Sequence, residues 1–450
     1  MKVFFFLMLI FCCAVYGRAQ FKNNKIAEDG LQTAVAINHK NPGNIIIAPG
    51  ANVVVYSVDG GNSWKETKLG YGVPGNALLL SSSNGTLNFF HIPIDGQGRN
   101  VQQIVYQSSL DGGKTWTPGV SIGSNPSKDQ DKPGVGINPK KGTLCIAWTQ
   151  FDKYGSSDST CQSNILFSQS SSGKRWGDPV QINQIPGDCA DGDDTVVGAI
   201  PLMDSEKKIF LIWSRHETIF FDRSYNAGDT WLTTDLAIVK QVGKWSLKIP
   251  GIDRCNRLPV IAIDNSQSFF KNSLYMVWAD QRNGENDTDI WFLRSTNRGD
   301  YWGAPFRINK DLPGKHQFMP WMAVDPSSGV IYIVYYDRRN YNDLQTDVYL
   351  AYSTDGGDKF TEQKISEKPF VPSAEKPFAS TISITADHGI IVPVWIRMED
   401  GKTSVWTTII KQNDIIKPDN MPRLQNGQRY KGRRSESPGN TGASKVKNKP

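Results

Sequence analysis

A short pattern, Ser-x-Asp-x-Gly-x-x-Trp, recurs along this chain and constrains its fold more than any other feature. Two copies are complete, Ser57 to Trp64 and Ser109 to Trp116. Asp can hydrogen-bond its own backbone two residues on, Gly supplies a positive φ, and Trp buries a large ring. Each copy therefore predicts a tight hairpin turn anchored by an aromatic side chain, and these residues are expected to build turns, not a site.

Further copies depart from the pattern at one or more positions. Three keep the frame with one substitution each, and a sixth keeps only the Gly and the Trp: Ser224 to Trp231, Ser295 to Trp302, Ser353 to Phe360, and Gln169 to Trp176. Six copies at intervals of roughly 50 to 70 residues indicate an internal repeat.

Short apolar segments separate the turns, and they follow one scheme. The first segment of a unit ends in Asn or Asp and a second segment follows it, as in Val35–Asn38 before Asn44–Ala48, 135–138 before 144–148, 261–264 before 274–278, and 322–325 before 331–335. Two more strands flank each turn. The unit is thus four strands, which is one blade of a β-propeller.

The repeat resembles the bacterial neuraminidase repeat, or Asp box, of the sialidase superfamily, over nearly all of residues 20–411. The resemblance implies a propeller fold. Because the hairpin also occurs in propellers that are not sialidases, it does not by itself imply that activity.

The number of blades follows from the two ends of the repeat region. Three strands, 380–385, 390–397 and 403–410, come after the last turn without an outer strand. Phe21–Glu28 reads like the outer strand Phe360–Glu367. We therefore predict an all-β propeller of seven four-stranded blades, with the N-terminal strand closing the last one and leaving no open edge. Six blades, as in the resembled sialidases, are the alternative.

The termini predict export. Residues 1–19 combine an early Lys, an apolar run and small residues before Gln20, which is typical of a secretory signal peptide. No later stretch has the roughly 20 apolar residues of a membrane helix. The positive charge lies mainly in residues 412–450, a basic tail expected to be disordered, so we expect no nucleic-acid partner for residues 20–411. We expect a secreted, periplasmic or extracellular monomer.

Four cysteines remain after signal cleavage, and they allow three complete pairings. Cys161–Cys189 is the preferred bridge, and Cys145 is expected to be a buried thiol. The loop Gly187–Asp194 carries the oxygen ligands that calcium prefers, without an EF-hand spacing. Calcium bound at Asp188–Asp194 is the only cofactor that the sequence suggests.

Propellers of the resembled kind bind ligands on one face. It is formed by the links into the first strands and the loops between second and third strands, and we call it the link face. Arginines there could grip a carboxylate bidentately. The candidate substrate-binding residues are Arg215, Arg257, Arg282, Arg338, Arg339 and Asp131. A competing interpretation makes Asp280, Arg282 and Asp289, with their counterparts Asp337, Arg338 and Asp347, salt bridges within blades.

The resemblance also defines what catalysis would require: an arginine cluster, a Tyr nucleophile activated by a Glu, and an acid/base Asp. Tyr341 with Glu217 could form the nucleophile pair. A uronate lyase would instead use His216, His316 and Tyr341 with Arg257. His39, His91 and His388 are expected on turns or rims. The family motif Phe/Tyr-Arg-Ile-Pro has only a near match at 306–309, in a predicted outer strand.

These observations predict a secreted propeller that binds or cleaves a glycan at its central cleft, with acidic glycans among the expected ligands. The alternatives are a non-catalytic glycan- or protein-binding scaffold, an exo-sialidase, and a uronate polysaccharide lyase.

Overall fold

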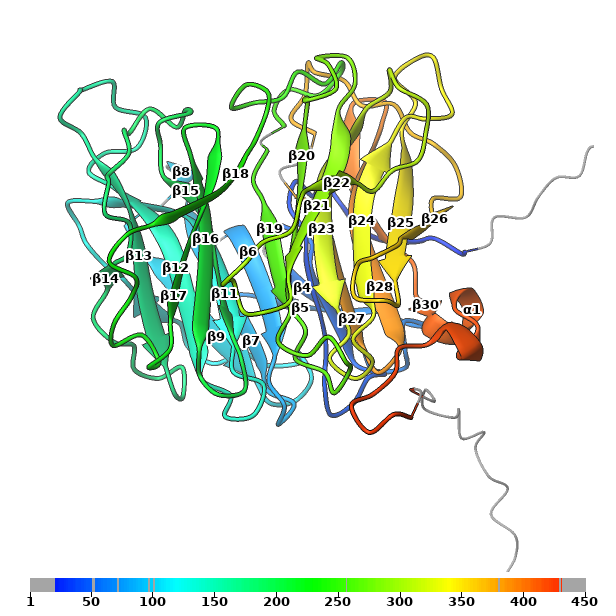
Figure 1. The fold of residues 1–450 in the computed structure, drawn as a ribbon, viewed down its shortest axis with the longest axis horizontal. Coiled ribbons are helices and arrows are strands. Elements are labelled where there is room, and N and C mark those ends of the chain that lie inside the picture. Colours follow the sequence, from blue (N-terminus) through cyan, green and yellow to red (C-terminus); the bar gives the residue numbers. More distant parts are fainter. Residues whose placement is uncertain are drawn as a thin grey trace, which may run out of the picture.

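The repeated hairpins close into a ring of blades. The structure is a computed structural model that describes residues 21–430, apart from 51–52, 71–72, 96–97, 100–101, 256, 379–380 and 429. The predicted signal peptide and the tail beyond residue 430 lie outside this part of the chain. The described residues form seven antiparallel blades of a β-propeller, as predicted, and Figure 1 shows their strands running from top to bottom.

In the first six blades the chain runs from the inner strand outward through four strands. Blade 1 is β2 (Ala34–Ile37), β3 (Ile45–Ala48), β4 (Val53–Ser57) and β5 (Lys65–Lys68). Blade 2 is β6 (Val73–Ser81), β7 (Leu87–Asp95), β9 (Ile104–Ser109) and β10 (Val120–Ile122), with β8 (Gly98–Arg99) paired to β7. Blade 3 is β11 (Asp129–Ile137), β12 (Leu144–Phe151), β13 (Ser163–Ser170) and β14 (Val180–Gln181).

The next three blades repeat this order. Blade 4 is β15 (Val197–Met203), β16 (Ile209–Arg215), β17 (Thr218–Ser224) and β18 (Leu236–Lys240). Blade 5 is β19 (Val260–Ile263), β20 (Leu274–Asp280), β21 (Asp289–Ser295) and β22 (Phe306–Arg307). Blade 6 is β23 (Gln317–Val324), β24 (Ile331–Asp337), β25 (Asp347–Ser353) and β26 (Thr361–Lys364).

Blade 7 joins the two ends of the chain. It consists of β27 (Ser383–Asp387), β28 (Ile390–Glu399), β29 (Lys402–Thr407) and the N-terminal β1 (Asn24–Glu28), with β30 (Ile410–Lys411) paired to β28. Strand β1 runs antiparallel to β29, with Asn24 opposite Thr407 and Glu28 opposite Ser404. The predicted closure by the N-terminal strand is confirmed, and β1 covers the edge that β29 would otherwise expose.

The hairpin turns are stabilised by side chains of the repeat itself, mainly the Ser and the Asp or Asn. In the first copy Gly61 N–H donates to Ser57 Oγ at 2.8 Å, and Ser63 N–H donates to Asp59 Oδ1 at 2.9 Å. The backbone group that Asp59 binds through Oδ1 is therefore four residues on, where the sequence suggested two. The Ser to Gly bond recurs in four further copies.

In several turns the aromatic ring also packs against the neighbouring blade. Trp231 of blade 4 packs edge-on against Phe167 of blade 3, and Trp302 of blade 5 packs against Phe221 of blade 4. The ring centroids lie 5.1 and 5.5 Å apart. Such edge-to-face contacts explain why the repeat keeps an aromatic residue at a solvent-side turn.

Ordered structure continues past Lys411, where the sequence placed the start of the tail. Helix α1 (Gln412–Ile415) and the 3-10 turn η1 (Pro418–Asn420) follow β30, and α1 lies at the lower right of Figure 1. Ile416 and Met421 are buried, and Gln412 accepts a hydrogen bond from Tyr332 Oη at 2.8 Å. A few apolar side chains within a polar stretch suffice to fix this segment. In the described part of the chain, helices reach neither the length nor the apolarity needed to span a membrane.

Candidate functional site

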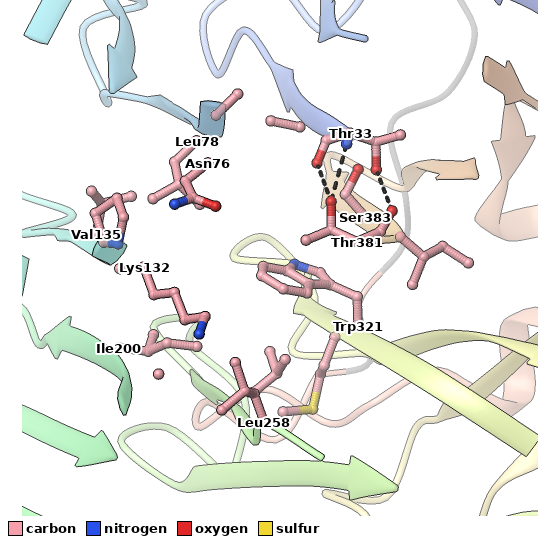
Figure 2. A pocket seen from close by; sticks show the side chains of 18 of the residues that line it. Thr33, Asn76, Leu78, Lys132, Val135, Ile200, Leu258, Trp321, Thr381 and Ser383 are labelled. Atoms are coloured by element: carbon pink, nitrogen blue, oxygen red, sulfur yellow. Dashed lines mark hydrogen bonds between the residues drawn. The ribbon is translucent and has the colours of Figure 1, made fainter. Parts of the chain in front are cut away.

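A cavity of about 690 Å³ lies on the propeller axis. Its wall is formed by the first strands of all seven blades and is mostly apolar, with Leu78, Val135 and Ile200 among the lining side chains (Figure 2). The charged lining residues are Asp131, Lys132, Asp253 and Arg254. They lie in, or just before, the first strands, at the link face. An apolar cavity with a few polar groups at its mouth is the usual form of a small-molecule site.

The first strands are bulged where they enter this cavity. The pairing of first and second strands shifts between Gly75 and Leu78, between Asp131 and Gly134, and between Phe318 and Trp321. Within these bulges Asn76, Lys132 and Met319 have φ of 49°, 45° and 51°. Residues other than glycine adopt such left-handed conformations at a cost, and bulges with this strain gather near functional sites, where they redirect side chains.

Asp191 is the centre of the charged groups at the mouth. It accepts hydrogen bonds from Lys132 Nζ at 2.8 Å, Arg254 Nη2 at 2.6 Å and Tyr154 Oη at 2.5 Å. We call these four residues the Asp191 cluster. Burial raises the pKa of Asp191, but the charges and hydrogen bonds of its three partners outweigh burial, and its pKa lies below the usual value. Asp191 is therefore held as a carboxylate.

A disulfide fixes the two loops that supply this cluster. Cys189 lies two residues before Asp191, and Cys161 lies on the loop that carries Tyr154; the two are bonded, which confirms the predicted pair. Gly155 N–H also donates to Cys189 O at 2.8 Å. Cys145 is a buried free thiol, as expected, and so is Cys255. The bridge thus holds blade 3 and the link to blade 4 in one arrangement.

Trp321 is one of three aromatic residues among the described residues that line the cavity, with Tyr154 and Phe378. It follows the bulge at Met319, is partly exposed, and reaches into the cavity, as does Lys132 from blade 3 (Figure 2). Among the side chains drawn in Figure 2, none is hydrogen-bonded to its indole N–H. A flat apolar ring with a polar N–H donor is thus presented to whatever enters the cavity.

The predicted arginine cluster does not assemble around the axis, and four of its five arginines bind neighbouring protein groups instead. Arg257 is buried against Asp193 and the carbonyl of Gly243. Arg338 is buried too, and it donates to Pro250 O at 2.7 Å and Thr346 Oγ1 at 3.0 Å. Arg215 ends β16 and is half-buried.

Two other predicted arginines form ion pairs within their blades. Arg282 Nε donates to Asp280 at 2.9 Å, and Arg339 Nε donates to Asp337 at 2.8 Å. Arg339 also donates to Glu362 at 2.6 Å. The counterpart of Arg282 in the repeat is therefore Arg339, where the sequence comparison suggested Arg338. Salt bridges within a blade, the competing interpretation from the sequence, thus account for the contacts of both Arg282 and Arg339.

Tyr341 and Glu217, the expected nucleophile pair, are not brought together. Tyr341 Oη donates to Asp347 Oδ2 at 2.8 Å within blade 6. Glu217 lies on the exposed hairpin between β16 and β17 of blade 4. His216 beside it is also exposed, with Nδ1 2.9 Å from Asp194 Oδ1. Asp131, by contrast, lies at the mouth as predicted and accepts a hydrogen bond from Asn76 Nδ2 at 2.6 Å.

The acidic loop expected to bind calcium directs its carboxylates to separate protein partners. Asp188 accepts a hydrogen bond from Thr195, Asp191 faces its cluster, Asp193 pairs with Arg257, and Asp194 pairs with His216. These carboxylates do not converge on one point as calcium ligands must. Calcium binding at this loop remains a prediction that would require them to leave their present partners.

His316 is nine-tenths buried, with Nδ1 3.0 Å from Thr288 Oγ1. Burial and the charge of Arg338 lower its pKa to about 4. His91 lies in β7 and not on a turn or rim as expected; burial lowers its pKa to about 4 as well. Both rings are therefore neutral at pH 7.

These two histidines predict acid sensitivity. Their folded-state pKa values lie below the unfolded value of 6.5, so on acidification the unfolded chain binds protons first. The neutral histidines favour the folded state fully above about pH 6.5. Between about pH 6.5 and pH 4 each of them lowers the unfolding free energy by about 1.4 kcal/mol per pH unit as the pH falls. Urea unfolding of the wild type and of H91Q/H316Q should show a shallower pH dependence in the variant between pH 6.5 and pH 4.5.

The difference between wild type and variant is the diagnostic quantity. Burial raises the pKa of Asp222 to about 7 and that of Asp337 to about 6. Such carboxyls favour the folded state at low pH and offset the histidines in either protein. Equal pH dependences in wild type and variant would contradict the assignment.

Sequence reasoning missed most of the Asp191 cluster. Lys132 and Arg254 stand in links that carry charged residues in most blades, and Asp191 was expected only as a calcium ligand. Tyr154 gave no signal, because it lies in a polar loop of blade 3. The position of Asp191 two residues after a bridged cysteine is the one local sign that its loop is held in place.

Comparisons with known proteins agree on the fold. No protein-family model and no curated protein matches the sequence. Among solved structures, an α-L-arabinofuranosidase from Fusarium graminearum in complex with an iminosugar inhibitor aligns with a TM-score of 0.52 at 13% identity, over 88% of this chain and 100% of that chain. The lectin BP39L from Burkholderia pseudomallei aligns with a TM-score of 0.53 at 12% identity, over 86% and 97%. At these identities the likeness shows the propeller fold alone.

Proposed function

We propose that this protein binds a carbohydrate at the link-face mouth of the axial cavity. The observation that carries the proposal is Trp321, whose ring enters the cavity near polar side chains that are fixed in place. Sugars offer apolar C–H faces that pack on aromatic rings and hydroxyls that pair with polar groups, so such a site suits them. The arabinofuranosidase and the lectin of similar fold support this choice of ligand class.

The charges at the mouth favour a neutral sugar over an acidic one. Lys132 and Arg254 both face Asp191, with separations of 2.8 and 2.6 Å. The carboxylate of an acidic sugar would have to compete with Asp191 for these two cations. Asp131 and Asp253 add further negative charge to the lining. The binding experiment described below therefore compares neutral glycans with acidic ones.

The Asp191 cluster favours binding of the carbohydrate without its cleavage. A glycosidase needs a protonated carboxyl as general acid, usually with a raised pKa. The pKa of Asp191 is lowered. The aspartates with raised pKa values do not line the cavity: Asp222, Asp235, Asp289, Asp325 and Asp337. The alternative, a glycoside hydrolase or lyase, would have to use Asp131, Asp253 or a group brought in by the ligand.

We also propose that the protein is exported. The disulfide between Cys161 and Cys189 supports this, because such bonds persist mainly in oxidising compartments. N-terminal sequencing of the protein recovered from the medium or periplasm, starting at Gln20, would establish it.

The test is a glycan array followed by calorimetry on the strongest hit, with wild type and W321A. Loss of the ring should weaken binding by about tenfold or more, since aromatic side chains at the centre of a site often contribute about 2 kcal/mol. Tyr301→Ala is the matched control, because Tyr301 is a 71% exposed aromatic residue on a hairpin turn. Unchanged affinity in W321A, or equal loss in Y301A, would contradict the proposed site.

Catalysis is tested on the same preparation. Sialosides, neutral oligosaccharides and uronate polymers are incubated with the wild type and assayed for reducing ends and unsaturated products. Turnover that is lost in D131N would favour the hydrolase or lyase alternative over simple binding. Binding with no turnover supports the proposal as stated.

A further inference from the structure

Two histidines occupy the same repeat position in the two blades that close the ring. In each blade the hairpin between first and second strands begins with Asn, Asp or Ser. The residue after it is Ser83, Pro139, Ser205, Asn265 or Pro326 in blades 2 to 6. In blades 1 and 7 it is His39 and His388. These two blades are neighbours only because the N-terminal strand closes the propeller. The two histidines therefore mark the place where blade 1 meets blade 7, which we call the seam of the ring.

Asp387 brings the two rings together. His39 Nδ1 lies 2.7 Å from Asp387 Oδ2, and His388 Nδ1 lies 2.8 Å from Asp387 Oδ1. The ring centroids of the histidines are 4.9 Å apart. One nitrogen from each ring and one carboxylate oxygen all lie within 4.8 Å of one another. We call His39, Asp387 and His388 the seam triad.

Two atoms of the triad, one from Asp387 and one from His388, lie close together without forming a hydrogen bond. Asp387 Oδ1 and His388 Nδ1 are both buried, and neither has a partner in hydrogen-bonding geometry among the described residues, despite their short separation. The Asp387 side chain is only 8% exposed. Buried polar atoms without partners are rare in folded proteins, and a cation bound between these two atoms would satisfy both.

Neighbouring groups hold the two turns that carry the triad. Gly389 N–H, directly after His388, donates to Asp325 Oδ2 of blade 6 at 2.8 Å. Gly389 O accepts a hydrogen bond from Gln412 N–H at 2.8 Å. On the other side of the seam, His39 N–H donates to Ser81 Oγ of blade 2 at 2.9 Å. The ligand atoms thus sit on rigid turns, as a metal site requires.

We propose that the seam triad binds a divalent transition-metal ion, Zn²⁺ above others, and that the ion ties blade 1 to blade 7. Two imidazole nitrogens and one carboxylate oxygen are ligands that zinc takes in proteins, with a further position left for water. The side chains of His39 and His388 are 36% and 26% exposed, so an ion can reach them from solvent. The triad lies at the hairpins opposite the link face, so this site is separate from the proposed carbohydrate site.

The experiment uses the full chain without an affinity tag of histidines, after treatment with a chelator. Titration with ZnCl2 in a calorimeter should show one ion per chain, and Co²⁺ should give the visible absorption of a site with nitrogen ligands. Zinc should also raise the melting temperature, because a ligand that binds the folded state stabilises it. Cys145 and Cys255 are fully buried and do not compete for metal.

The variants are H39Q, which alters a partly exposed turn residue, and H388N, since Asn tolerates the φ of 52° at this position. Each should bind zinc at least tenfold more weakly and lose the zinc-dependent rise in melting temperature. H216Q is the matched control, because His216 also pairs with an aspartate, at 2.9 Å, but on an exposed loop. No zinc binding by the wild type, or equal binding in wild type and H39Q, would overturn the proposal in favour of a metal-free hydrogen-bonded cluster.

Discussion

A chain carrying Phe21→Ala is expected to lose about 3–5 kcal/mol of unfolding free energy, the usual cost of removing a buried phenylalanine ring. Phe21 precedes the closing strand β1 and is 8% exposed within the core of the blades around the closure. Asn23, two residues further on, exchanges two hydrogen bonds with Glu367. Asn23 N–H donates to Glu367 Oε1 at 3.0 Å, and Glu367 N–H donates to Asn23 Oδ1 at 2.8 Å. Loss of the ring should loosen the whole strand and expose the edge of β29.

Urea unfolding measures this effect, and Phe269→Ala provides the matched control. Phe269 is 60% exposed, so its removal should change stability by about 0.5 kcal/mol or less. Deletion of residues 20–28 should have a larger effect than F21A and favour aggregation, because an uncovered strand edge pairs with other chains. A fully stable, monomeric deletion variant would show that β1 does not close the ring.

Loss of the disulfide is expected to affect stability and carbohydrate binding together. The bridge joins two cysteines that are 28 residues apart in the sequence. For a loop of this size, the loss of chain entropy in the unfolded state stabilises the fold by about 3–4 kcal/mol. C161S should also weaken carbohydrate binding, because Tyr154 and Asp191 lie on the two loops that the bridge joins. The affinity change is measured by calorimetry below the melting temperature of the variant.

The pair of cysteines provides its own controls. C161S, C189S and the double variant should be destabilised to similar extents, since the bond is absent in all three. A reducing agent should destabilise the wild type and leave the double variant unchanged. Affinity that is preserved in a folded C161S protein would show that the cluster is positioned without the bridge.

Some charged residues near the candidate site belong to the repeat and stabilise blades. Arg282 and Arg339 were attractive because arginine recognises carboxylates, yet their side chains are only 20% and 15% exposed and each is bound to an aspartate within its own blade. Asp131 was correctly placed at the mouth, because the first strands of all blades converge there. The partners that make the mouth polar, Lys132 and Arg254, required the geometry of three links to be recognised.

Local sequence features were enough to predict the architecture. The turn residues, the recurring pairs of apolar segments and the incomplete last unit are local features, so they predicted seven blades and closure by Phe21–Glu28 without tertiary information. Cysteine position within the repeat likewise favoured the bridge between Cys161 and Cys189. Each of these inferences depends on which residues a short segment contains.

The candidate site, by contrast, depends on contacts between residues far apart in the sequence. Asp191 meets Lys132, Tyr154 and Arg254 across 37 to 63 positions of sequence separation, and His39 meets Asp387 across 348. Such contacts depend on how loops of different blades lean over the axis and on how the ring closes. Loop directions are set by bulges, hydrogen bonds and packing between blades, none of which leaves a periodic mark in the sequence.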